Sequence, residues 1–239
     1  MAVKNIEYKG KLFDVHYEII NHNCINDVII LHGWGSNKEV MKSAFKDYLK
    51  EFRHIYIDLV GFGKSTQDIV GNSHDFAKIV ELLLSRIQAS KNIIIGHSFG
   101  GKIATLLKPK LLVLLSSAGI LEKKSLSVKG KIAIAKLLKP LRVRAKFLIA
   151  KDAKDLSPNM YITFKQVVNE DFSDIFKNFS NNCLIFWGKD DEAVNVSSAE
   201  QIHSFIKNSY LKIYDGDHYF FLYNSKDICD NIIKGTSKK

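Results

Sequence analysis

One short stretch constrains this chain more than any other, because it sets a sharp turn between a strand and a helix. It reads Ile93-Ile94-Ile95-Gly96-His97-Ser98-Phe99-Gly100-Gly101, an apolar run that breaks into G-x-S-x-G. This pattern is typical of a nucleophile elbow, in which a serine with a strained backbone exposes its hydroxyl. The residues two before and two after the serine must be small, since a Cβ there would collide with the folded backbone. The stretch therefore predicts a nucleophile at Ser98.

Three further segments supply the other groups that a nucleophilic serine needs. They span residues 28–35, 186–191 and 216–218, and the last two place an acid and then a histidine after Ser98 in chain order. With that order of serine, acid and histidine, the chain resembles the α/β-hydrolase superfamily from about residue 11 to about residue 235. The resemblance implies a small capped serine hydrolase of the esterase type.

Hydrophobic patterning predicts an α/β fold of alternating strands and helices. An antiparallel edge hairpin is expected over 5–20, followed by buried strands at 27–31, 54–58, 92–96, 110–115, 183–187 and 211–214. Capping boxes at 36–39 and 197–200 predict two helix starts. Strands joined by crossover helices imply a mainly parallel central sheet with helices on both faces.

The strand–helix alternation stops between residues 117 and 181, where members of the superfamily insert a helical cap. No linker rich in Pro, Gly or Ser divides the chain into independent domains. We therefore predict one α/β-hydrolase core made of residues 1–117 and 181–239, with a small helical cap insertion over 118–180.

The catalytic roles follow from what a serine hydroxyl requires. It needs a base within hydrogen-bond reach, and that base needs a third group to fix its tautomer. Ser98, His218 and Asp191 are the predicted nucleophile, base and acid. Asp190 and Glu192 are adjacent alternatives for the acid, but Asp191 is favoured because Gly188-Lys189-Asp190-Asp191 matches the superfamily's G-x-x-D. Asn195 stands where the superfamily often has a proline, which loosens this alignment.

Acyl transfer also requires hydrogen-bond donors aimed at the oxyanion, each worth about 3 kcal/mol. The backbone amide of Phe99, the residue after the nucleophile, is the first expected donor. By resemblance to the superfamily's H-G-x-G loop, the amide of Trp34 is the second. His32, Trp34 and His97 are expected to line the pocket. An ordinary strand-to-helix turn at 32–35 is the alternative interpretation of the loop.

Residues 58–65 read Asp-Leu-Val-Gly-Phe-Gly-Lys-Ser and end like a phosphate-binding loop. The Walker pattern needs a glycine where this chain has Asp58, so that interpretation fails. The same stretch resembles the D-x-x-G-x-G-x-S turn of α/β-hydrolases, which implies a structural role near the site.

Positive charge is concentrated in the predicted cap. Residues 121–155 hold eleven Lys and Arg against three acidic residues, a net charge of +8 out of the chain's +10. A solvated helix surface is one interpretation; attraction of an acidic ligand, such as an anionic substrate, an acidic carrier protein or a lipid surface, is the other. Nucleic-acid binding is not expected, because the basic residues alternate with aliphatic ones rather than with base-stacking aromatics.

Other classes of protein are disfavoured by what the sequence lacks. The cysteines Cys24, Cys183 and Cys229 are odd in number and widely spaced, so no disulfide framework is expected. The histidines form no zinc-binding pattern, and no metal or other cofactor is expected. No secretory signal and no transmembrane segment are recognisable, which predicts a cytoplasmic location.

Three classes of function remain open from the sequence. The leading one is a serine hydrolase that cleaves a small carboxylic ester or thioester through an acyl-enzyme. The second is a carbon–carbon bond hydrolase or lyase with the same triad, and the third is a non-catalytic ligand sensor. The His32-Gly33-Trp34-Gly35 loop also resembles that of acyl-carrier-protein methyl ester esterases, for which a basic cap would be suitable.

Overall fold

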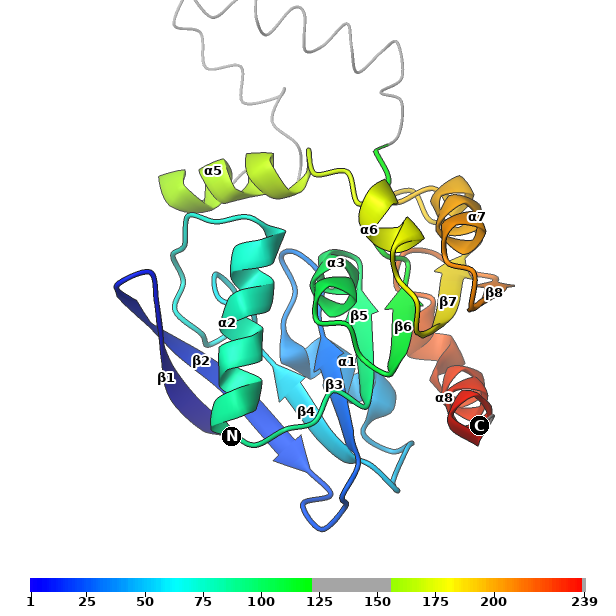
Figure 1. The fold of residues 1–239 in the computed structure, drawn as a ribbon, viewed down its shortest axis with the longest axis horizontal. Coiled ribbons are helices and arrows are strands. Elements are labelled where there is room, and N and C mark those ends of the chain that lie inside the picture. The colour runs from blue at the N-terminus through cyan, green and yellow to red at the C-terminus, as the bar shows by residue number, and fades with distance from the viewer. Residues whose placement is uncertain (122–155, 238–239) are drawn as a thin grey trace, which may run out of the picture.

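The computed structural model describes residues 1–121 and 156–237, which form an eight-stranded sheet flanked by helices (Figure 1). The strands are β1 (Ala2–Tyr8), β2 (Lys11–Ile20), β3 (Asp27–Leu31), β4 (Arg53–Ile57), β5 (Ile93–His97), β6 (Leu111–Leu115), β7 (Asn182–Gly188) and β8 (Ser209–Tyr214). The helices are α1 (Lys38–Phe45), α2 (Ser73–Arg86), α3 (Phe99–Leu106), α5 (Pro158–Val167), α6 (Ser173–Lys177), α7 (Val196–Phe205) and α8 (Phe221–Ser237).

The strand order confirms the predicted α/β fold with a mainly parallel sheet. The order is β1-β2-β4-β3-β5-β6-β7-β8, and every neighbouring pair from β4 to β8 is parallel. β2 pairs antiparallel with both β1 and β4, so the predicted edge hairpin is present. Its turn has Lys9 and Gly10 at φ 50° and 70°, the left-handed values of a tight hairpin turn.

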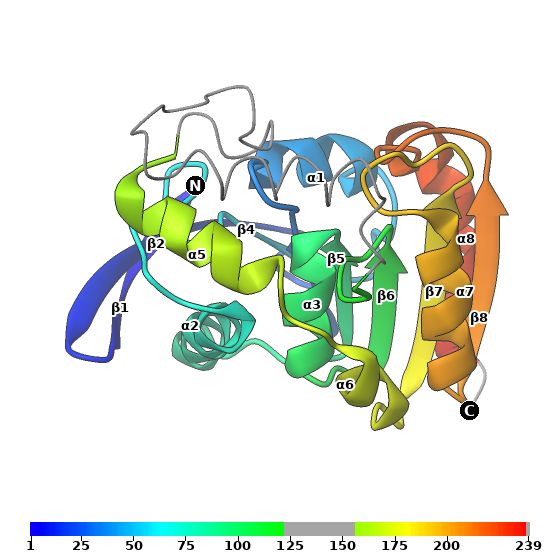
Figure 2. The same ribbon diagram turned by 90° about the horizontal axis from the view of Figure 1, so that it is seen from above.

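Helices cover both faces of the sheet, with α1 and α8 on one face and α2, α3, α6 and α7 on the other (Figure 2). Successive strand side chains point to opposite faces, so each strand contributes to two cores. In β3, Val28 and Ile30 pack into the core beneath α1 and α8, whereas Ile29 and Leu31 pack into the core beneath α2 and α3. This double burial explains why the strands are continuous apolar runs.

Two helices begin at a different residue from the one that the capping boxes predicted. The N-cap of α1 is Asn37, not Ser36, and its side chain accepts a 3.0 Å hydrogen bond from the amide of Glu39. The N-cap of α7 is Asn195, not Ser197, whose amide donates to the Asn195 side chain at 2.9 Å. Asparagine caps a helix as well as serine does, so the path of the preceding loop selects between neighbouring candidates.

The insertion between β6 and β7 is described only in part. α5 lies above the carboxyl ends of the strands, beside the start of α2, and α6 packs against α3 and α7 (Figure 1). The basic residues predicted to dominate the cap, in 122–155, lie outside the described residues. None of the helices within 1–121 and 156–237 is long and apolar enough to cross a membrane.

Candidate active site

Ser98 occupies the turn between β5 and α3 with φ 50° and ψ −114°. A non-glycine residue pays of the order of 1–3 kcal/mol for such a conformation, and hydrogen bonds from both sides hold it here. The Ser98 amide donates to the carbonyl oxygen of Leu115 at 3.0 Å, and the amide of Ala118 donates to the Ser98 carbonyl oxygen at 3.1 Å. The hydroxyl of Ser98 does not cap α3, so it is available for chemistry.

The glycines around Ser98 are required by close backbone contacts. A Cβ on Gly96 would lie 2.4 Å from the carbonyl oxygen of Gly100, and one on Gly100 would lie 2.6 Å from that of His32. Both distances are far below van der Waals contact. The absence of side chains therefore lets α3 approach β5 and the loop that follows β3.

The predicted base and acid lie together although they are far apart in the sequence. Nδ1 of His218 is 2.7 Å from Oδ2 of Asp191, whose side chain is fully buried. The other oxygen of Asp191 accepts hydrogen bonds from the amides of Ala193 and Val194 at 2.8 and 2.9 Å. Asp190 and Glu192 are exposed, so Asp191 is the buried one of the three adjacent acids.

A glycine also explains how the acid loop and the histidine loop meet. A Cβ on Gly188, at the end of β7, would lie 2.2 Å from the carbonyl oxygen of Asp217. The backbone just before the Asp191 loop therefore touches the backbone just before His218. This contact brings the carboxylate of Asp191 within reach of the imidazole.

The environment of Asp191 keeps it ionised. Burial alone would raise the pKa of its carboxyl, but the hydrogen bonds from His218 and from the amide of Val194 outweigh burial and hold the pKa below its usual value. Asp191 is thus a carboxylate at neutral pH. A carboxylate acceptor at Nδ1 places the proton of a neutral His218 on that nitrogen, so Nε2 is the free acceptor of the ring.

The two predicted oxyanion donors, the backbone amides of Phe99 and Trp34, lie on the two loops beside Ser98. Phe99 is the first residue of α3, so its amide has no partner within the helix. Gly33 brings the other loop beside the nucleophile, since a Cβ on Gly33 would lie 3.1 Å from Cβ of Ser98. Neither the amide of Phe99 nor that of Trp34 donates a hydrogen bond within the described part of the chain.

His32 orients the backbone amide of Trp34 through the carbonyl group of Gly33. Its Nε2 accepts a 3.0 Å hydrogen bond from the amide of Leu59, so Nδ1 carries the proton and donates to the carbonyl oxygen of Gly33 at 2.7 Å. In a trans peptide the carbonyl and the amide point in opposite directions. Fixing the Gly33 carbonyl therefore fixes the direction of the Trp34 amide.

His32 and His97 are not exposed residues of a pocket wall, contrary to expectation. His32 has no exposed surface and uses both ring nitrogens inside the chain, and His97 is 1% exposed. Burial lowers the pKa of His32 to about 4 and that of His97 to about 3, so both are neutral at physiological pH. The sequence does not reveal this, because an adjacent glycine or serine says nothing of which way an imidazole points.

Trp34 instead belongs to an aromatic cluster. Its ring lies 4.8 Å from Phe62 and 5.5 Å from Phe99 between centroids, both edge-on, and 5.3 Å from Phe164 of α5. The cluster is an apolar surface beside the two candidate oxyanion donors. Phe62 and Phe164 were not predicted as site residues, since no motif marks them.

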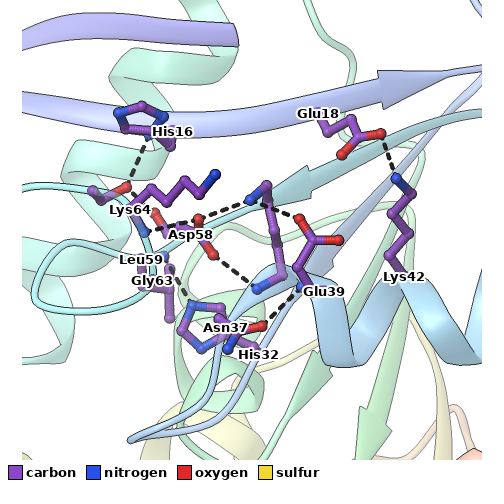
Figure 3. A network of polar contacts seen from close by, with 12 residues as sticks. His16, Glu18, His32, Asn37, Glu39, Lys42, Asp58, Leu59, Gly63 and Lys64 are labelled. Carbon is purple, nitrogen blue, oxygen red and sulfur yellow. Dashed lines mark hydrogen bonds and ion pairs between the residues drawn. The ribbon is translucent and has the colours of Figure 1, made fainter. Parts of the chain in front are cut away.

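The D-x-x-G-x-G-x-S stretch at 58–65 is held by internal hydrogen bonds and contacts the loop at 32–35 through Leu59. Asp58 is 1% exposed and accepts hydrogen bonds from the amide and Nζ of Lys38 at 2.8 and 3.0 Å and from the amide of Lys64 at 3.1 Å (Figure 3). Gly63 has φ 57° and leaves room for this carboxylate, because a Cβ there would lie 2.3 Å from it. Leu59, the residue after Asp58, donates its backbone amide to Nε2 of His32.

A cavity of about 370 Å³ opens elsewhere in the molecule. Its lining includes Thr105 and Lys108 at the opposite end of α3 from Ser98, together with Ile175 and Phe179. It contains none of the candidate catalytic residues. The described residues also include no group of three or more His, Cys, Asp or Glu side chains placed to hold a metal ion.

Comparisons with known proteins agree with this architecture. Residues 27–110 match the family model described as alpha/beta hydrolase fold. A pimeloyl-[acyl-carrier protein] methyl ester esterase of Vibrio campbellii is 26% identical over 64% of this chain and 51% of its own length, so the chain spans about half of that relative. An uncharacterized hydrolase, YugF, of Bacillus subtilis is 23% identical over 83% of this chain and 85% of its own length.

A solved structure shows the same fold. A thermophilic esterase from Thermogutta terrifontis superposes with a TM-score of 0.76 and 16% identity, covering 100% of this chain and 99% of the esterase. The strand order, the elbow at Ser98 and the family match point to the same conclusion. The chain has the α/β-hydrolase fold.

Proposed function

We propose that this protein is a serine hydrolase that cleaves a carboxylic ester or thioester through an acyl-enzyme. The observation that carries the proposal is the 2.7 Å contact between His218 Nδ1 and the buried carboxylate of Asp191. It leaves Nε2 of His218 as the nitrogen that can accept a proton. Ser98, half-buried at its strained turn, supplies that proton from its hydroxyl.

In the proposed reaction, Ser98 Oγ attacks the carbonyl carbon while His218 Nε2 takes the hydroxyl proton. The amides of Trp34 and Phe99 bind the negative oxygen of the tetrahedral intermediate. His218 then protonates the leaving alcohol or thiol as the bond to it breaks, which leaves an acyl group on Ser98. Water, activated by the same imidazole, releases the carboxylic acid and restores the hydroxyl.

Covalent labelling tests the nucleophile directly. We expect one fluorophosphonate adduct per chain by intact mass, and none in Ser98→Ala. Turnover of p-nitrophenyl esters of increasing acyl length, beside a vinylogous diketone, then separates the classes of function. Labelling without turnover of any substrate would indicate a ligand sensor, and cleavage of the diketone alone would indicate a carbon–carbon bond hydrolase.

A methyl ester carried on an acidic protein is the second candidate substrate. Two observations favour it: the net charge of +8 over 121–155, and the similarity to pimeloyl-[acyl-carrier protein] methyl ester esterases, one of which is 40% identical over 33% of this chain. A basic surface raises the encounter rate with an acidic carrier, an effect screened over about 8 Å at physiological salt.

The carrier hypothesis is tested by reversing charge at Lys136, Lys139 and Arg142. The triple variant should lose kcat/KM for an acyl-carrier-protein ester, more at low than at high salt, and keep its rate on a neutral ester. Equal salt dependence for both substrates would assign the basic segment to surface solvation.

A further inference from the structure

A buried lysine lies one helical turn beyond the nucleophile and has no part in the proposed chemistry. Lys102 of α3 is 1% exposed, and its Nζ donates to the carbonyl oxygen of Val167 and to Oε2 of Glu170, each at 2.6 Å. Nζ also lies 4.4 Å from the ring centroid of Phe172. An ammonium group is costly to bury unless it is paired and hydrogen-bonded, so the partners of Lys102 indicate which segments it joins.

The partners of Lys102 lie at the end of α5 and in the segment that follows it. Val167 is the last residue of α5, where the helix dipole favours a positive charge. Glu170 accepts a 2.9 Å hydrogen bond from the amide of Ser73, the first residue of α2, and another from the Ser73 hydroxyl. Carboxylates are favoured at such helix starts. The pair Lys102–Glu170 therefore joins α3, the end of α5 and the start of α2.

α5 is the helix that carries Phe164 to the active site. Figure 1 shows α5 above the start of α2, and Figure 2 shows it ending beside α3. Phe164 of α5 lies 5.3 Å from Trp34 between ring centroids. Thr163 anchors the helix to the loop before α2, donating to the carbonyl oxygen of Ile69 at 2.6 Å and accepting from the amide of Gly71 at 3.2 Å. Lys102 holds Val167, three residues beyond Phe164 and thus on a neighbouring surface of the helix.

We propose that Lys102 is a positioning residue: by clamping α5 through Val167 and Glu170, it sets Phe164 against Trp34 as the wall that receives the acyl chain of the substrate. The inference rests on the proposed ester hydrolysis and specifies an apolar acyl group for the same site. Burial lowers the pKa of Lys102, and the hydrogen bond to Glu170 opposes this effect without cancelling it. Loss of the clamp moves the wall, and it leaves Ser98, His218 and Asp191 in place.

The first test compares two acyl lengths in three variants. Lys102→Met keeps the length of the side chain without its charge, Lys102→Arg keeps the charge, and Lys165→Met is the matched control on α5, since that lysine lies over Tyr161. With p-nitrophenyl octanoate, Lys102→Met should raise KM about tenfold, whereas kcat on p-nitrophenyl acetate stays within about twofold of wild type. Lys102→Arg should recover most of the loss, and Lys165→Met should show none. A parallel loss of kcat on both esters would overturn the proposal.

A double-mutant cycle with Phe164→Ala identifies the route of the effect. If Lys102 acts through Phe164, the double variant should lose little more octanoate kcat/KM than Phe164→Ala alone, because residues that act as one unit are non-additive. Additive losses would contradict the proposal. Glu170→Gln, which keeps an acceptor for Ser73, replaces Lys102→Met in the cycle if that variant does not fold.

A measurement without substrate separates this inference from the proposed function. Of the two tryptophans, Trp187 has no exposed surface, so acrylamide quenching of fluorescence reports on the half-buried Trp34. Lys102→Met should increase quenching and Lys165→Met should not, even if the protein hydrolyses no ester. Unchanged quenching in folded Lys102→Met would show that α5 does not depend on the clamp.

Discussion

Nε2 of His97 lies 3.0 Å from the backbone carbonyl oxygen of His218, so the residue before the nucleophile holds the loop of the predicted base. The two imidazole rings lie 4.5 Å apart between centroids. Burial, with a smaller effect from His218, lowers the pKa of His97 to about 3, so its ring is neutral and Nε2 must carry the proton that it donates. Nδ1 of His97 is buried without a partner in the described part of the chain.

Replacing His97 should therefore lower the rate through the placement of His218. We expect His97→Leu to reduce kcat by roughly ten- to a hundredfold, because a small displacement of a catalytic group is costly. His97→Gln, whose amide can still donate, should lose less. Steady-state kinetics on p-nitrophenyl butyrate, with thermal unfolding as the control for folding, distinguish the two variants. Equal losses would mean that the hydrogen bond to His218 is unimportant.

The two adjacent aspartates should behave very differently. Asp191→Asn should lower kcat by about four orders of magnitude, because the amide imposes the wrong tautomer on His218. Asp190→Asn should stay within about twofold of wild type, since Asp190 is exposed and its backbone amide, not its side chain, bonds Gly216. Both rates are measured on the same ester. A larger loss of kcat in Asp190→Asn would assign the role of catalytic acid to Asp190 instead of Asp191.

Acid should destabilise the protein through His32. Burial holds the folded-state pKa at about 4 against 6.5 for a free imidazole, so between these pH values the unfolded chain binds more protons and stability falls as pH falls. The loss from His32 is on the order of 3 kcal/mol, complete below about pH 4. Urea unfolding at pH 7, 5.5 and 4.5 should show that the free energy of unfolding depends less steeply on pH in His32→Gln than in wild type. Identical slopes would indicate that His32 is protonated in the folded state.

The network in Figure 3 offers a matched pair of lysines for stability measurements. Lys38 and Asp58 are each 1% exposed and 3.0 Å apart, whereas the Lys42–Glu18 pair is 26% and 18% exposed. Lys38→Met should lower the free energy of unfolding by about 3–5 kcal/mol, because it leaves a buried carboxylate without its counter-charge. Lys42→Met should cost no more than about 1 kcal/mol. Chemical denaturation measures both, and a similar cost for the two would rule out a special role for burial.

Local sequence patterns predicted the framework of this protein well. The apolar runs marked the six parallel strands to within two residues, and the turn at Lys9 and Gly10 marked the edge hairpin. The G-x-S-x-G pattern placed a strained turn at Ser98, where the structure has one. These features depend on residues close in the chain, whose sterics and periodicity can be judged without knowing what packs against them.

The tertiary structure decided the features that join distant segments. Which of Asp190 and Asp191 meets His218 depends on a contact between distant segments. The hydrogen bonding of His32 likewise depends on the backbone amide of Leu59. Phe164 and Lys102 carry no motif, because their partners Trp34 and Glu170 lie far away in the chain. The sequence by itself determined which segments become strands, helices and the Ser98 turn, since those follow from local backbone sterics and side-chain periodicity. Which neighbours each buried polar or aromatic side chain meets was decided only by the packing of the folded chain, where burial and hydrogen-bond geometry select one partner among many.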